Sequence, residues 1–240
     1  MKNLFCLLFC SVFIFGGCNS DLITAMPPEE ADVSTEEENE YSIDSYTYSV
    51  DYRSLPPSQR KAALQIPNET INKMTTKAIV QAVFDYPMII DIFLANDFTR
   101  GFIGVFGDNN AYLELLRRDE TSKFLLERLL ATADNIEITL SSYILEYVMT
   151  LPKYLSSYNA DEMKILAEAI FIKHKIEQNS EINYISVVAI GKTMLAANYT
   201  PFVNTVKENP SLQSSINSME ITIEYSEIII DYGINFINEK

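Results

Sequence analysis

The chain has 240 residues and a formal net charge of −15, because 33 Asp and Glu residues outnumber 18 Lys and Arg residues. The basic residues are spread singly rather than gathered in a patch, which excludes nucleic acid as an expected partner. One histidine, His174, and three cysteines near the start are too few for a His-rich metal site or a Cys–His nucleophile. We therefore expect no bound metal and no cofactor.

The first residues have the pattern of a signal peptide. Met1 to Gly17 contains Lys2 and then an apolar run of about a dozen residues, which is too short to span a membrane comfortably. Phe15-Gly16-Gly17-Cys18 resembles the lipobox of bacterial lipoproteins, although Phe15 stands where Leu is usual. The alternatives are an ordinary secreted protein cleaved near Gly17, or a short N-terminal anchor. The resemblance implies a signal peptide over residues 1–17, lipid such as palmitate on Cys18, and attachment to a membrane of the cell envelope.

An acidic segment follows the cysteine. Between Asn19 and Tyr52 there are ten acidic residues and no basic ones, with few large aliphatic side chains. Such a segment cannot bury enough apolar surface to offset its ordering entropy, so residues 18–53 are predicted to form a disordered tether. Its acidic residues also resemble, more loosely, the surface-export signals of Bacteroidota lipoproteins. Near its end lie four tyrosines, Tyr41, Tyr46, Tyr48 and Tyr52. They either dock on the domain or remain in solvent, and the sequence leaves both alternatives open.

Residues 54–240 are predicted to form a single domain, beginning at a helix-start cluster near Ser54. The stretch from Met74 to Leu130 contains several short amphipathic helices separated by Pro, Gly, Asp and Asn. A helix is expected from an N-cap at Thr75 or Thr76 to about Asp85, and Pro87 then starts another. Phenylalanines spaced by four follow at 98, 102 and 106, but glycines at 101 and 104 weaken the expectation of a regular helix there.

Four further helices are expected, over residues 136–149, 159–178, 182–197 and 219–238. The third is apolar around nearly its whole circumference and is predicted to lie in the centre. The fourth begins with MEITIEY, which alternates like a strand, but its apolar positions follow a helical period for longer. Together these patterns predict an all-α globular bundle of about eight to ten short helices. Four residues are predicted to be buried: Leu166, Ile170, Val188 and Leu195.

One part of the domain resembles a known group of proteins. The residues are Met74-Thr75-Thr76, then Val83-Phe84-Asp85-Tyr86-Pro87, and then Leu113-Glu114-Leu115-Leu116-Arg117-Arg118. They are similar to a helical domain of uncharacterised secreted or surface proteins from gut-type Bacillota and Bacteroidota. The resemblance implies an extracytoplasmic location and assigns no catalytic residue.

The catalytic candidates are few. His174 is expected on the solvated side of its helix, and Asp108-Asn109-Asn110 lacks the spacing of an EF-hand. Gly191-Lys192-Thr193 resembles the end of a phosphate loop, but Ser186 stands where the first glycine would be required. We expect a non-enzymatic, envelope-anchored module that binds an envelope or extracellular protein or a glycan. The alternative is a carboxylate-dependent hydrolase, or an accessory subunit of an envelope enzyme, in which Asp85, Asp91 and Asp97 converge with Arg100.

Overall fold

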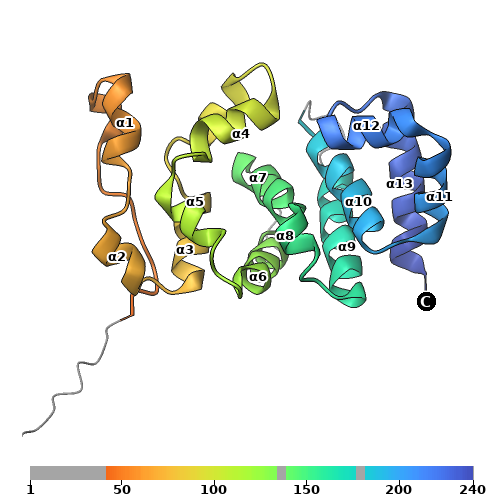
Figure 1. The fold of residues 1–240 in the computed structure, drawn as a ribbon, viewed down its shortest axis with the longest axis horizontal. Coiled ribbons are helices and arrows are strands. Elements are labelled where there is room, and N and C mark those ends of the chain that lie inside the picture. The colour runs from red at the N-terminus through yellow and green to blue at the C-terminus, as the bar shows by residue number, and fades with distance from the viewer. Residues whose placement is uncertain (1–41, 134–138, 177–181, 240) are drawn as a thin grey trace, which may run out of the picture. The chain divides into compact units, whose positions relative to one another are not determined.

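A computed structural model describes residues 42–133, 139–176 and 182–239, which form an all-α fold (Figure 1). These residues contain 13 α-helices, ten of them with seven or more residues, and no strand. The predicted all-α class is confirmed. In chain order the elements are η1 (Tyr52–Ser54), α1 (Pro57–Ala63), α2 (Asn68–Lys73), α3 (Thr76–Phe84), η2 (Ile89–Leu94), α4 (Phe98–Phe106), α5 (Asn110–Leu115), α6 (Thr121–Ala133), α7 (Leu140–Met149), α8 (Pro152–Leu155), α9 (Ala160–Ile176), α10 (Tyr184–Ala196), α11 (Thr200–Glu208), α12 (Pro210–Ser218) and α13 (Ile223–Asn238), where η denotes a 3-10 helix.

The segment before α1 packs on the helices, although the sequence assigned it to the tether. Ile43 forms an isolated parallel bridge with Met74. The Tyr48 hydroxyl donates to the Ala82 carbonyl oxygen at 3.2 Å, and the Tyr52 hydroxyl donates to that of Pro87 at 3.0 Å. Tyrosines have an apolar ring and a polar end, so they can bury their rings while their hydroxyls bond the backbone. The packed part of the chain therefore includes residues before Ser54.

The helix α4 is regular despite its two glycines. A Cβ at Gly101 would collide with the backbone carbonyl of Ile92 in η2, so the glycine permits these two elements to touch. Phe98 and Phe102 on α4 then pack against Tyr147 of α7, with ring centroids 5.0 and 4.8 Å apart. A glycine that weakens helix propensity is thus required here by packing. The helix that was expected to start at Pro87 is the 3-10 helix η2.

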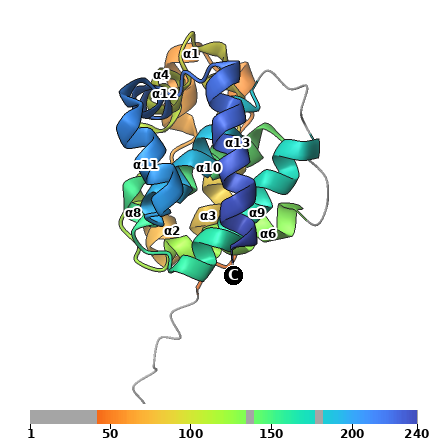
Figure 2. The same cartoon turned by 90° about the vertical axis from the view of Figure 1, so that its right-hand side faces the viewer.

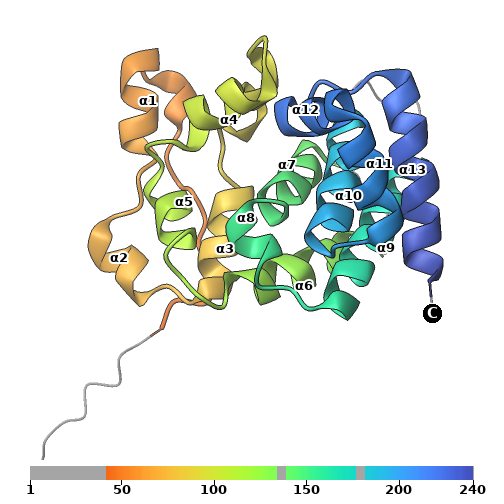
Figure 3. The ribbon, with the colours of Figure 1, turned by 45° about the vertical axis from the view of Figure 1, so that its right-hand side comes forward.

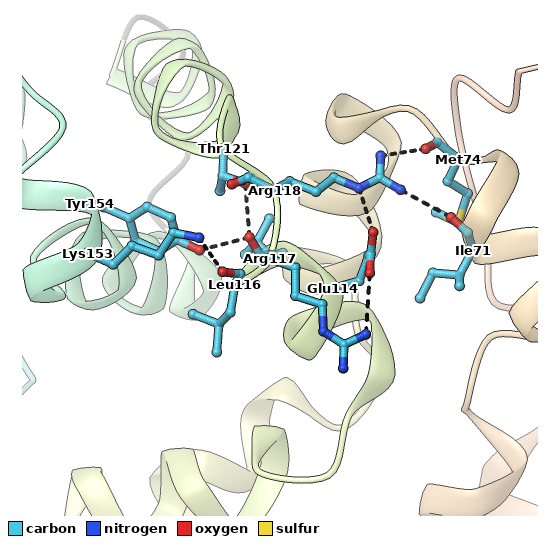
Figure 4. A network of polar contacts seen from close by, with 10 residues as sticks. Ile71, Met74, Glu114, Leu116, Arg117, Arg118, Thr121, Lys153 and Tyr154 are labelled. Carbon is cyan, nitrogen blue, oxygen red and sulfur yellow. Dashed lines mark hydrogen bonds and ion pairs between the residues drawn. The ribbon is translucent and has the colours of Figure 1, made fainter.

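The C-terminal end of α5 is closed by side chains from other helices (Figure 4). The last carbonyl groups of a helix have no partner within it. The Leu115 carbonyl oxygen accepts from the Tyr154 hydroxyl at 3.1 Å and from Thr121 Oγ1 at 3.0 Å. The Leu116 carbonyl oxygen accepts from Lys153 Nζ. These contacts fix α5 against α6 and α8.

Arg118, just after α5, joins this region to α2. Its Nε donates to Glu114 Oε1 at 2.8 Å, and its two terminal nitrogens donate to the carbonyl oxygens of Met74 and Ile71 at 2.6 and 3.3 Å (Figure 4). The Arg118 guanidinium thus donates to carbonyl oxygens at the end of α2 and at the same time forms an ion pair with Glu114. The Met74 and Leu113–Arg118 segments that carry the family resemblance are therefore joined by structural contacts.

The helix α10 is the centre of the C-terminal half. It packs on α7, α9, α11, α12 and α13, as Figures 2 and 3 show for α9, α11 and α13. At Gly233 of α13, an added Cβ would lie 2.8 Å from Ile190 Cγ2 of α10, so this glycine permits the close approach of the two helices. The prediction that residues 182–197 form the central buried helix is confirmed.

The boundaries of the other long helices follow local chemistry. Asn159 Oδ1 accepts from the Glu162 amide at 3.0 Å, and Glu162 Oε2 accepts from the Asn159 amide at 2.8 Å, which is a capping box at the start of α9. The segment 219–238 is helical from Ile223 onward, and Thr222 caps it. The expected helix over residues 136–149 begins at Leu140 in the structure. Its first residues, like the expected end of α9 at 177 and 178, lie outside the described residues.

Three of the four predicted core residues are buried, namely Leu166, Ile170 and Val188. Leu195 is only half-buried, which corrects the prediction. It packs against the edge of the core on a face of α10 that borders a cavity. Periodicity identifies the apolar positions of a helix, but only the neighbouring helices decide which of them are covered.

Candidate functional site

A groove of about 580 Å³ lies beside α10, a volume within the range of small-molecule sites. Its walls come from the ends of α7 and α8, from α9 and α10, and from α12. Leu and other apolar side chains make up most of the lining, with one lysine. The lining residues are Thr150, Leu151, Pro152, Leu155, Ser156, Met163, Lys192, Leu195, Ala196 and Asn217.

The sequence after α7 produces one wall of the groove. Pro152 lacks an amide proton and disfavours a helical conformation at Leu151, which is extended with φ −65° and ψ 143°. The chain therefore leaves α7 after Met149 and restarts in α8, a helix of four residues. The buried Tyr154 of α8 holds this wall against the end of α5.

Lys192 is the charged residue among the lining residues described. Its ammonium lies 5.4 Å from the centroid of the Tyr147 ring, within the range of a cation–π contact. Burial lowers its pKa, because the charged form loses hydration. Five ion pairs join described residues, and none of them includes Lys192. An ammonium at the wall of an apolar groove can attract an anion from solution.

The hydroxyl groups in the groove are engaged with the backbone. Thr150 Oγ1 donates to the Tyr147 carbonyl oxygen at 2.9 Å, and Ser156 Oγ donates to that of Lys153 at 3.0 Å. The side-chain Oδ1 of Asn217 accepts from Gln213 Nε2 at 3.3 Å, which leaves the side-chain Nδ2 of Asn217 as a donor. The donors that the lining residues offer to a bound anion are therefore Lys192 and Asn217.

Gly191-Lys192-Thr193 lies inside α10 and does not form a loop. Thr193 is buried, and its hydroxyl donates to the Ala189 carbonyl oxygen at 2.8 Å within the same helix. These residues therefore do not form a phosphate loop. The sequence signal for the groove was a lone lysine in an otherwise apolar helix, but sequence alone could not show that Lys192 borders a cavity.

Two of the acidic residues proposed for a hydrolase, Asp85 and Asp97, have structural partners. Asp85 ends α3 and pairs with Arg128 Nη2 at 2.9 Å. Asp97 caps α4 by accepting from the Arg100 amide at 2.6 Å. Asp91 lies in η2. Asp85 lines a cavity of about 460 Å³ together with Arg128 and Glu127, a residue that sequence reasoning did not select.

A buried polar cluster between α7, α9 and α10 was also missed. Glu146 is fully buried, and its Oε1 lies 2.8 Å from Lys173 Nζ. Its Oε2 accepts from the Ser186 hydroxyl at 2.6 Å. The Lys173 ammonium also lies 3.3 Å from the centroid of the Tyr143 ring. Ser186 and Lys173 each contact a different oxygen of Glu146, and all three side chains are buried, so the geometry supports a structural role.

His174 is half-buried, which corrects the expectation of a solvated histidine. Asn183 Nδ2 donates to the His174 carbonyl oxygen at 3.3 Å. Burial lowers the pKa of the imidazole, and a side-chain hydrogen bond with Asn183 opposes that shift. Both residues line a cavity of about 230 Å³ with part of α13. The sequence could not reveal this, because residues 221–227 cover the histidine only after α13 has packed.

Comparisons with known proteins give no match: no family model matches the chain, and no match was found among curated proteins or solved structures. In the described part of the chain, no set of three or more His, Cys, Asp or Glu side chains is placed to hold a metal ion. No helix within the described ranges has the length and apolar content needed to cross a membrane.

Proposed function

We propose that the protein is a non-enzymatic binding module of the bacterial cell envelope. It is held at a membrane by lipid on Cys18, and it presents the helical domain on an acidic tether. The single observation that carries the binding role is the groove beside α10, an apolar cavity with one cationic side chain at its wall. Proteins that bind small ligands commonly combine an apolar lining with a few polar groups that fix orientation.

The anchor is supported by the sequence Phe15-Gly16-Gly17-Cys18 after an apolar run. Each buried CH₂ adds about 0.8 kcal/mol of membrane affinity, so two or more acyl chains hold a folded domain firmly. Replacing Cys18 with Ala should release or misprocess the protein, as measured by membrane fractionation of cells. An alanine variant that stays in the membrane fraction like the unchanged protein would place the anchor elsewhere.

The tether supports display away from the membrane surface. A random coil over residues 19–41 would have an end-to-end distance of roughly 25 Å, and repulsion among its acids would extend it. Deleting residues 22–39 should weaken capture of a partner on cells while the purified protein keeps its affinity. The deletion stops before Ile43, because Ile43, Tyr48 and Tyr52 contact the domain.

The binding role is tested by filling the groove. Asn217 is exposed and lines the groove, so Asn217→Trp should obstruct it while α12 stays intact. Asn204→Trp, on the exposed side of α11, is the matched control. Envelope components captured by the full chain should be lost with the first variant and retained with the second. Equal capture by both variants would contradict a role for this groove.

The hydrolase alternative has one observation in its favour. Asp85 and Glu127 line the same cavity of about 460 Å³. The Asp85–Arg128 pair is partly solvated, however, with side-chain exposures of 45% and 27%. Hydrolysis of peptidoglycan, glycan or peptide substrates by the full chain, lost on Asp85→Asn or Glu127→Gln, would favour the enzyme over the binding module.

A further inference from the structure

We infer that the groove beside α10 binds a small organic monocarboxylate, with its carboxylate at Lys192 and its apolar body along Leu151, Leu155 and Leu195. This inference rests on the proposed binding role of the groove and adds the chemical class of the ligand. The occupant is a small molecule with one negative charge and an aliphatic or aromatic chain.

The single negative charge follows from the donors in the groove. Lys192 supplies the one formal charge among the lining residues described, and Asn217 supplies a neutral amide. A phosphate dianion would leave charge uncompensated at this site, and burying an unpaired charge is costly. A carboxylate needs one opposite charge and a few hydrogen bonds, which match an ammonium and an amide.

The apolar body follows from the walls. Leu151, Leu155, Met163, Leu195 and Ala196 offer hydrocarbon surface. Leu195 is partly buried on a helix whose residues are mostly buried, and a ligand chain would cover the part of it that remains exposed. Apolar burial contributes about 25 cal/mol per Å² of surface removed from water, so the walls favour a ligand with a hydrocarbon chain.

The position of the ammonium supports binding of an anion from outside the chain. Lys192 is half-buried, lies over the Tyr147 ring and belongs to none of the ion pairs among described residues. A bound carboxylate would give the lysine the negative partner that Glu146 gives to Lys173. The Thr150 and Ser156 hydroxyls donate to the backbone, so Lys192 is the principal group that can select charge.

The test uses the full chain in lipid nanodiscs, with empty nanodiscs as the blank, and ¹⁹F NMR titration of 4-(4-fluorophenyl)butanoate. Its uncharged primary amide is the matched ligand. The carboxylate should bind at least about tenfold more tightly than the amide, as expected for a charge-assisted contact that excludes water. Equal affinity of the two ligands would overturn the inference.

Variants assign the charge to one residue. Lys192→Met should bind the carboxylate no more tightly than the amide, whereas Lys192→Arg should keep most of the difference in affinity. Lys207→Met, which removes an exposed charge on α11, is the matched control and should bind like the unchanged protein. Thermal unfolding of each variant establishes that the fold is retained. If a folded Lys192→Met variant still binds the carboxylate more tightly than the amide, the inference is overturned.

Three further outcomes test the class of ligand and separate this inference from the proposed function. If the acetylated peptide Leu-Leu-Phe with a free C-terminus binds more than tenfold more tightly than the arylbutanoate, the occupant is a peptide end and the small-molecule inference fails. If the arylbutanoate does not bind, but Asn217→Trp abolishes capture of envelope components, the ligand class is wrong and the binding function stands. If the arylbutanoate binds and Asn217→Trp leaves capture unchanged, the inference stands and the proposed function of the groove fails.

Discussion

Lys173 and Lys192 occupy neighbouring helices, and each places its ammonium over a tyrosine of the same face of α7. The Lys173 ammonium is 3.3 Å from the Tyr143 ring centroid, and that of Lys192 is 5.4 Å from the Tyr147 ring centroid. Lys173 is buried and has the carboxylate of Glu146 beside it, whereas Lys192 borders a groove. A lysine thus has a structural role where the fold buries it beside a carboxylate. It becomes a candidate binding group where the fold leaves one side open.

The largest expected effect comes from breaking the buried pair. Lys173→Met removes the ammonium beside the buried Glu146, and breaking a buried ion pair in this way costs about 3–5 kcal/mol of unfolding free energy. Urea denaturation of the full chain measures this loss of unfolding free energy. The control is Asp108→Asn, which removes the exposed partner of Lys61, 3.2 Å away, and should cost at most about 1 kcal/mol.

The double variant Glu146→Leu with Lys173→Met sharpens this prediction. Replacing both partners removes the uncompensated charge, so the double variant should be more stable than Lys173→Met alone. A double variant that is less stable than either single variant would show that the Ser186 and Tyr143 contacts, rather than the charge balance, dominate this region.

A second prediction compares the core with the groove wall. Ile170→Ala deletes a fully buried side chain and should lower the unfolding free energy by about 2–5 kcal/mol, through lost transfer energy and a cavity. Leu195→Ala should cost distinctly less, because Leu195 is half-buried beside an existing groove. Thermal or urea unfolding of the two variants decides this, and equal losses would mean that the groove is closed in solution.

A third prediction concerns alkaline pH. Burial raises the pKa of Tyr112 to about 12 and raises that of Tyr154 further. A tyrosine whose folded pKa exceeds its unfolded value of 10.0 contributes stability that is complete below pH 10 and is lost as the pH rises through the folded pKa. The unfolding free energy should therefore fall between pH 10 and 12.

Tyr154→Phe tests this residue directly. At neutral pH the change should cost about 1 kcal/mol, because the Thr121 hydroxyl, 3.0 Å from the carbonyl oxygens of both Leu115 and Arg118, can still donate to Leu115. Above pH 10 the variant should lose stability less steeply than the unchanged protein, as measured by urea unfolding from pH 8 to 12. Parallel pH profiles for the two proteins would contradict the assignment.

The smallest expected effect is that of Lys192→Met. The half-buried ammonium loses hydration on folding, and burial lowers its pKa, so removal of the charge should leave stability unchanged or slightly higher. The same substitution thus lowers stability at position 173 and does not lower it at 192. A clear loss of unfolding free energy in Lys192→Met would mean that this lysine has a structural partner.

The helical class, several helix caps and the identity of the central helix can be predicted from local sequence patterns. Thr75, Asn109 and Asn159 accept from backbone amides at helix starts, as their residue types predict. These features are local, because a cap or an apolar period involves residues only a few positions apart. The alternation in MEITIEY was misleading only over its first residues, since the longer helical period prevailed from Ile223 onward.

Which charged residues are buried, and where a cavity remains, depends on how the helices pack and could not be predicted from the sequence. Glu146, Lys173 and Ser186 come from three helices, and no spacing in the chain relates them. Leu195 has the same periodicity as its buried neighbours and differs because it borders a cavity. The docking of Tyr48 and Tyr52 and the need for Gly101 likewise depend on segments that meet only after folding. Local patterns fix which residues can form a helix, whereas burial and ion pairing depend on distances between helices.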